Sequence, residues 1–228
     1  MPSTARTHQL DLSLLYHIMN RGNARLEIFH NQEDYLYFIG ILQNYYQEYH
    51  FFIYHWVLMP NHYHLLLELQ EPKKLSKIMA GINRSYVHYH HKTYQSAGHL
   101  FQGRFKSKPI EKEKYLLSCG RYIERNPVKA GFAQYAEDYP YSSSRFYVFG
   151  KPDHLTTKDP LIETFGEDPK QHTQAYRDFL RKFDAEEERQ FESFEMPLGS
   201  REFRHRLTKE KGLFLPRKRG RPKELIYL

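Results

Sequence analysis

Two histidines one residue apart, His62 and His64, stand in the largely apolar run of residues 59–68. Alternate residues of a β-strand lie on the same face, so both imidazoles can bind one metal ion. With 14 histidines in 228 residues, roughly one His-x-His triplet is expected by chance. The second triplet, His88 to His90, lies in an expected helix, where residues two apart point about 200° apart. Only the first pair therefore has a geometry suited to a metal.

Tyr122 and Asn126 extend this site, because residues four apart share one face of a helix. Two imidazoles and an amide oxygen would leave open positions on Mg²⁺ or Mn²⁺ for phosphate oxygens. A tyrosine hydroxyl beside the ion could then attack phosphorus. The chain has 19 tyrosines, however, and most tyrosines serve in packing or at the surface. The residues alone favour a packing role for Tyr122 over a catalytic one.

The hydrophobic pattern predicts the elements that must position these residues. Period-two and helical spacings predict strands over residues 14–19, 51–59, 62–69 and 104–110, and helices over 34–49, 75–94 and 113–125. Residues 20–23 are expected to end the first strand as a basic turn. This order is the α+β, ferredoxin-like split β-α-β-β-α-β arrangement with an added helix that carries Tyr122. Its antiparallel sheet has helices on one face and leaves the other face free for a ligand.

The composition of the chain changes after Gly150, where prolines and glycines interrupt charged helical segments such as residues 171–183 and 201–207. We therefore expect one main domain over 1–150, a small helical appendage over 151–212, and a basic tail over 213–228. The tail is too polar and kinked to form a packed element by itself.

The charge of the chain favours a polyanionic partner. The formal net charge is +7, the isoelectric point is near 9.2, and 16% of the residues are aromatic and could stack on unpaired bases. Modest basicity is also common in soluble proteins. The single cysteine, Cys119, cannot form an intrachain disulfide and fits a reducing compartment. Neither a signal peptide nor a membrane span is expected, so a cytoplasmic protein is the default.

Four spaced blocks resemble one protein family. They are residues 16–23 (YHIMNRGN), 58–66 (LMPNHYHLL), 99–105 (HLFQGRF) and 122–131 (YIERNPVKAG). In this order they look like the signature blocks of the REP-associated tyrosine transposases, which are IS200-like, single-tyrosine HUH transposase relatives. The resemblance implies an HUH nuclease domain over 1–150, with His62 and His64 as metal ligands, Asn126 as a third ligand and Tyr122 as the nucleophile.

The same resemblance implies a substrate, single-stranded DNA that folds into hairpins of repetitive extragenic palindromes. Attack by Tyr122 would leave a 5′-phosphotyrosine and a free 3′-OH, and a 3′-OH could reverse the step and join strands. It also places the first and third blocks near DNA, which implies phosphate contacts from Asn20, Arg21, Asn23 and Arg104, although each could be an ordinary loop residue. Mg²⁺ or Mn²⁺ is the expected cofactor.

The tail resembles an AT-hook core at residues 219–222 (RGRP). Such a core lies in the narrow minor groove of A·T-rich duplex DNA. Arg217, Arg219 and Arg221 are therefore candidate DNA-binding residues, and a nonspecific basic tail is the alternative.

Two residues near the site have open roles. Gly120 costs a helix about 1 kcal/mol relative to alanine, and it either loosens the helix or makes room for a neighbour. Glu68 shares the strand face of the two histidines, but a solvated or pairing role is favoured over that of a general base.

The leading hypothesis is a metal-dependent single-stranded DNA endonuclease and strand-transferase in the bacterial cytoplasm, associated with the nucleoid. The first alternative is a non-catalytic DNA-binding or repressor protein with the same fold and a basic tail. The second is an HUH replication initiator or relaxase, although such proteins are larger. A monomer is favoured over a dimer.

Overall fold

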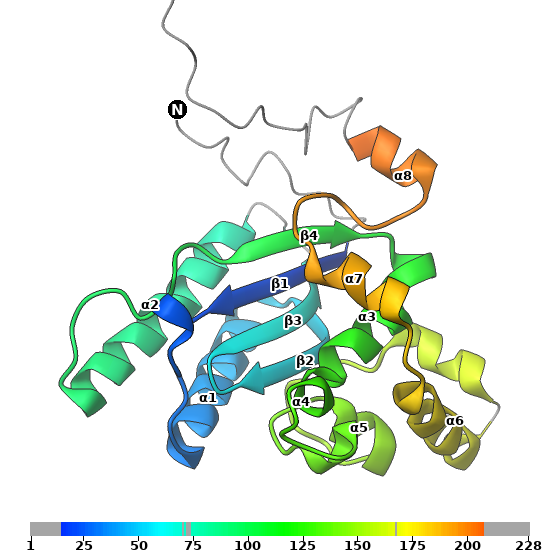
Figure 1. Cartoon of the computed structure of the whole chain (residues 1–228), viewed down its shortest axis with the longest axis horizontal. Coiled ribbons are helices and arrows are strands. Elements are labelled where there is room, and N and C mark those ends of the chain that lie inside the picture. Colours follow the sequence, from blue (N-terminus) through cyan, green and yellow to red (C-terminus); the bar gives the residue numbers. More distant parts are fainter. Residues whose placement is uncertain (1–14, 70, 72–73, 167, 208–228) are drawn as a thin grey trace, which may run out of the picture.

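The central element is a four-stranded antiparallel sheet with the order β2-β3-β1-β4 (Figure 1). The computed structural model describes residues 15–69, 71, 74–166 and 168–207. The strands are β1 (Leu15–Arg21), β2 (Phe52–Met59), β3 (His62–Glu68) and β4 (Lys106–Ile110). With the helices described below, they confirm the predicted ferredoxin-like α+β fold.

Strand β1 is longer than predicted, because Asn20 and Arg21 belong to it and pair with Tyr63 and His62 of β3. The prediction that residues 20–23 are a turn was wrong at these two positions. Backbone hydrogen bonds on both sides hold the chain extended there, from Gly22 N to Asn61 O (2.8 Å) and from Gln102 N to Arg21 O (2.9 Å). These bonds outweigh the local preference of Asn and Gly for turns.

One face of the sheet packs against α1 (Gln32–Tyr49) and α2 (Leu75–Tyr94). Helix α1 begins at Asn31, whose side chain accepts a hydrogen bond from Asp34 N in a capping box. Alternate strand residues such as Ile18 and Leu65 point into this apolar layer together with Phe38. This layer is the main core of the molecule.

The opposite face packs against α3 (Lys112–Glu124), which is followed by the short α4 (Asn126–Lys129). Leu66 and Val57 of the sheet meet Leu116 and Ile123 of α3 in a second apolar cluster. The prediction that this face is free for a ligand was therefore wrong over much of its area. Because α3 carries apolar residues at helical spacing, it buries them on the sheet.

The remaining short elements are η2 (Asn23–Arg25), η4 (Ala136–Asp138), α5 (Ser144–Phe149), η5 (Pro160–Phe165), α6 (Pro169–Arg181), α7 (Ala185–Glu192) and α8 (Arg201–His205). Elements η5, α6 and α7 contact α3. The helices predicted over 171–183 and 201–207 correspond to α6 and α8, whereas α7 was not predicted. The predicted domain limits at 150 and 212 stay predictions, and the tail lies outside the described residues. Within the described part, no helix has the length and apolar character needed to span a membrane.

Candidate functional site

Three imidazoles meet on the α3 face of the sheet. His62 and His64 of β3 point to the same side, and their ring centroids lie 5.1 Å apart. His17, on the neighbouring strand β1, lies beside them, with its Nε2 2.7 Å from Nδ1 of His64. The predicted pair thus occupies one face as expected, and His17 is an addition that sequence reasoning missed.

Burial keeps these imidazoles neutral. It lowers the pKa of His17 and of His64 well below the ordinary value. The nearby Lys108 charge is a smaller cause for His17, and the proximity of the other two imidazoles and of Arg21 is a smaller cause for His64. Burial and the Arg21 charge lower the pKa of His62 to about 4. Neutral imidazoles keep a ring nitrogen lone pair, which a metal ion requires.

Tyr122 of α3 lies against the histidines. Its ring stands edge-on to that of His64 at 5.9 Å and to that of His17 at 5.8 Å. Burial raises the pKa of Tyr122 above its ordinary value, and Glu192 adds to this effect. The hydroxyl therefore carries its proton at neutral pH, and it must lose that proton to act as a nucleophile.

Asn126 closes the site from the start of α4. Its Nδ2 donates to the carbonyl oxygens of Tyr122 (2.8 Å) and Ile123 (3.2 Å), which are in the last turn of α3. Asn126 also acts on the pKa of His62, which it raises against the larger lowering by burial. The side chain of Asn126 thus lies beside the histidine pair.

Arg21 brings a positive charge to the same place. It is opposite His62 in the sheet, and its charge is among the causes that lower the pKa of His62 and His64 and that oppose the rise at Tyr122. Its Nε is buried and has no hydrogen-bond partner in the described structure. Arg21 therefore has a donor available for an incoming phosphate.

The other predicted DNA-binding residues lie in different surroundings. Asn23 and Arg104 are exposed on two loops that are joined by a hydrogen bond from Asn23 N to Leu100 O (2.8 Å). Asn20 is buried, faces the α1 and α2 side, and accepts a hydrogen bond at its Oδ1 from Arg21 N (3.0 Å). Its contact with DNA stays an untested prediction. Three further candidates, Arg217, Arg219 and Arg221, lie outside the described residues.

Glu68 lies at the far end of β3 from His62. Its Oε2 accepts hydrogen bonds from Tyr54 (2.8 Å) and Lys112 (2.7 Å). The structure therefore gives Glu68 the pairing role rather than that of a base at Tyr122.

The donor set fits a divalent ion. No group of three or more His, Cys, Asp or Glu residues among the described residues is placed to hold a metal. Two imidazoles and one amide oxygen are nevertheless sufficient when phosphate and water fill the remaining positions. The Nδ1 atoms of His62 and His64 hydrogen-bond to Asn61 Oδ1 (2.6 Å) and to His17 Nε2 (2.7 Å). One nitrogen of each ring is thus available to an ion.

A buried polar cluster lies between strand β2 and helix α3. His55 of β2 lies between Glu124 and Asp159, each at 2.9 Å, and all three side chains are fully buried. Burial alone would lower the pKa of His55, but the hydrogen bonds to Asp159 and Glu124 raise it to about 9. A methyl group at Gly120 would lie 2.5 Å from the His55 ring. Of the two roles considered for Gly120, the structure confirms room for a neighbour.

A segment after α6 covers the candidate site. We call residues 185–194, which comprise α7 and the two residues after it, the cover segment. Its Phe191 packs on Tyr122 with 5.4 Å between ring centroids, and its Phe194 packs on His17 at 4.7 Å. Tyr122 is consequently only 8% exposed. The sequence of this segment is mostly acidic and polar, and it did not predict that the segment covers Tyr122.

Polar contacts hold the cover segment in place. The buried Lys108 donates hydrogen bonds to the carbonyl oxygens of Gln190 (2.6 Å) and Ser193 (2.5 Å). Acidic residues of α7 form ion pairs with cations of α3, of α4 and of the residue between them, namely Glu187 with Arg121, Glu188 with Arg125, and both Glu188 and Glu192 with Lys129.

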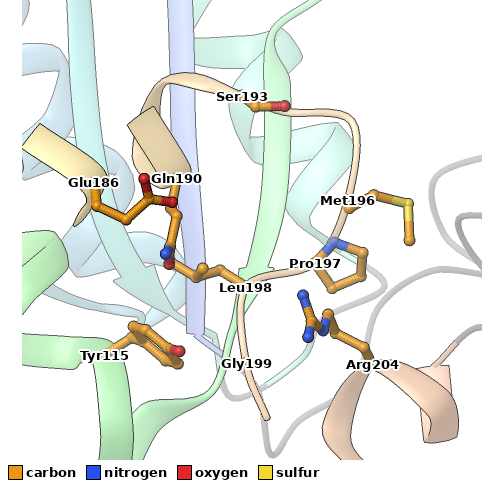
Figure 2. Close-up of a pocket in the computed structure, with 9 residues that line it drawn as sticks. All are labelled: Tyr115, Glu186, Gln190, Ser193, Met196, Pro197, Leu198, Gly199 and Arg204. Carbon is orange, nitrogen blue, oxygen red and sulfur yellow. The ribbon is translucent and has the colours of Figure 1, made fainter. Parts of the chain in front are cut away.

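The far side of the cover segment is hollowed. A pocket of about 390 Å³ lies between this segment, Tyr115 of α3 and Arg204 of α8, and Figure 2 shows the residues around it. It is lined by Tyr115, Glu186, Gln190, Ser193, Met196, Pro197, Leu198, Gly199 and Arg204. The cover segment therefore borders both the candidate site and this pocket.

Comparisons with known proteins identify the family and support the fold. No curated protein matches the chain. A solved structure of a REP-associated tyrosine transposase bound to a REP hairpin superposes with a TM-score of 0.53. It is 22% identical in sequence, and the match covers 66% of this chain and 88% of that chain, which shows a shared fold. The family model described as "Transposase IS200 like" matches residues 12–126, half of the chain, and these residues include His62, His64, Tyr122 and Asn126. The chain belongs to the IS200-like transposase family.

Proposed function

We propose that this transposase is a metal-dependent endonuclease and strand-transferase that acts on hairpin-forming, repetitive palindromic single-stranded DNA. The observation that carries the proposal is the position of Tyr122 beside the neutral His62–His64 pair, with Asn126 and Arg21 at its edge. The hairpin bound by the structurally similar protein supports the choice of substrate.

In the proposed reaction, Oη of Tyr122 attacks the scissile phosphorus and loses its proton. The bond from phosphorus to the 3′-oxygen breaks, and the 3′-oxygen gains a proton. The products are a 5′-phosphotyrosine and a free 3′-OH, and attack by another 3′-OH reverses the step and joins strands. A bound Mg²⁺ or Mn²⁺ would supply positive charge to the phosphate oxygens. Arg21 would add a second positive charge through its available Nε.

One chain provides every component of this site, since His62, His64, Tyr122, Asn126 and Arg21 all lie on β1, β3, α3 and α4. This completeness supports a protein that acts as a monomer. The basic tail would add affinity for duplex DNA, including A·T-rich DNA, in the same reading.

The nucleophile is tested with labelled single strands of repetitive palindromes from the source genome, incubated with Mg²⁺ or Mn²⁺. Tyr122→Phe should abolish cleavage and the covalent adduct on a denaturing gel, and hairpin binding should stay within about twofold because only a hydroxyl is lost. Tyr115→Phe, on the same helix, is the matched control and should retain the adduct. An adduct formed by Tyr122→Phe would contradict the assignment.

The metal site is tested in the same assay together with calorimetry. His62→Ala and His64→Ala should remove cleavage and most Mn²⁺ binding, whereas His88→Ala, at an exposed position of α2, should change neither. Unchanged Mn²⁺ binding by the His62→Ala/His64→Ala double variant would show that the ion binds elsewhere.

A further inference from the structure

We propose that His17 is a positioning residue of the metal site, which holds the His64 ring by accepting a hydrogen bond from its Nδ1. The inference rests on the proposed function. Its basis is the contact of 2.7 Å between His17 Nε2 and His64 Nδ1, with the ring centroids 4.9 Å apart and the ring planes 30° from each other. Both side chains are almost completely buried, so no water competes for this hydrogen bond.

At 2.7 Å, one of these two ring nitrogens must donate an N–H group and the other must accept it. Only one arrangement suits a metal. When the proton of His64 is on Nδ1 and points to His17, its Nε2 has a lone pair for the ion. When His17 donates instead, the proton of His64 is on Nε2 and blocks coordination. A partner that accepts from the other ring nitrogen is the usual means by which proteins orient metal-binding histidines.

His17 itself is placed as a partner and not as a ligand. Its Nε2 is directed at His64, and the described residues contain no set of three His, Cys, Asp or Glu that could hold an ion. Its ring also contacts Tyr122 at 5.8 Å. His17 thus fixes the spacing between a metal ligand and the nucleophile.

The test compares Mn²⁺ affinity, measured by calorimetry on the full chain, among His17 variants. His17→Leu removes the acceptor, and the expected loss of affinity is about 10- to 100-fold. His17→Gln can place an amide oxygen near the position of Nε2, and it should rescue affinity to within a few-fold of wild type. The free energy of unfolding of each variant is measured in parallel.

The matched control is His90→Leu. His90 is also buried and contacts a second imidazole, His30, at 3.1 Å, but on the opposite side of the sheet. Its loss should leave Mn²⁺ affinity unchanged. If His17 has only a structural role, the Mn²⁺ affinity should fall in proportion to the free energy of unfolding in His17→Leu, His17→Gln and His90→Leu alike. The positioning role requires affinity to fall in His17→Leu even when its stability equals that of His17→Gln.

A second readout is the position of the ring proton, obtained from ¹H–¹⁵N spectra of the histidine rings with Zn²⁺ as a diamagnetic probe. The His64 proton is expected on Nδ1 in wild type and in His17→Gln. A proton on Nε2 of His64, or equal Mn²⁺ affinity in His17→Leu and wild type, would overturn the role of His17 and leave the metal site standing. Absence of any Mn²⁺ binding by wild type would overturn both proposals.

Discussion

His55 shows how one buried side chain can tie distant parts of this chain together. Its two ring nitrogens contact Glu124 of α3 and Asp159 of the segment before η5. Glu124 also accepts hydrogen bonds from Ser143 (2.6 Å) and Tyr176 (2.9 Å). An imidazolium between two carboxylates is stable in the folded state, whereas the unfolded chain loses this proton at an ordinary pKa.

This arrangement predicts a dependence of stability on pH. The folded pKa of His55 is raised from 6.5 to about 9, so its contribution is complete below pH 6.5 and is lost as the pH rises through 9. The loss is on the order of 3 kcal/mol. Lys108, whose pKa is lowered to about 8, acts in the opposite direction at high pH. The measurement is therefore the difference in urea-unfolding free energy between wild type and His55→Gln, from pH 6 to pH 10.

That difference should shrink as the pH rises. The control is His50→Gln, at an exposed histidine just before β2, and it should follow wild type throughout. A difference that is constant over this range would show that His55 is not charged in the folded protein.

Sequence reasoning reached some of these residues and not others, for physical reasons. The period of a strand is sufficient to place His62 and His64 on one face, and the period of a helix places Tyr122 near Asn126. His17 lies 47 positions from His64, and His55 lies 104 positions from Asp159. Such contacts depend on strand order and on tertiary packing, which local periodicity does not contain. Gly120 was ambiguous for the same reason.

At the level of elements, strands and helices with a regular apolar period were predicted to within a few residues, whereas α7 was missed. Its sequence, AEEERQFE, buries a single apolar side chain, Phe191, and its position depends on ion pairs with α3 and α4. The cations that pair with α7 belong to the helices that carry Tyr122 and Asn126. DNA phosphates would compete with α7 for these cations.

We expect Phe191→Ala to accelerate formation of the covalent adduct severalfold at limiting hairpin concentration. The reason is access, because Phe191 lies on the ring of Tyr122 and a phosphorus atom must approach its hydroxyl. The assay is the initial rate of adduct formation, measured at a temperature where circular dichroism shows the variant to be folded, since truncation of a buried Phe costs about 3–5 kcal/mol. Phe183→Ala, at an exposed phenylalanine just before α7, should leave the rate unchanged. A slower Phe191→Ala would mean that the cover segment assists the reaction.

At the scale of the whole molecule, the predicted limit at residue 150 separates groups that meet in the structure. Asp159 and Tyr176 lie beyond it, and they contact His55 and Glu124, which lie before it. A chain of residues 1–150 would leave the buried His55 and Glu124 without these partners. Unpartnered buried groups of this kind are strongly destabilising.

Two truncated chains test this prediction by calorimetry. Residues 1–207 should unfold in a single transition near the wild-type Tm, because they retain the whole cluster. Residues 1–150 should unfold at a much lower temperature or fail to fold. Equal midpoints for the two chains would show that residues 1–150 form an independent folding unit.

Because one chain holds the whole candidate site, the number of DNA ends that one molecule can hold is also set. Each site has one Tyr122, and under the proposed chemistry a phosphotyrosine occupies it until a 3′-OH resolves it. One molecule can therefore hold one broken DNA end at a time. A single chain can therefore nick a strand, reseal it or transfer one end. Excision of a segment with two ends would require either two molecules at one locus or two successive turnovers with release of the first end between them.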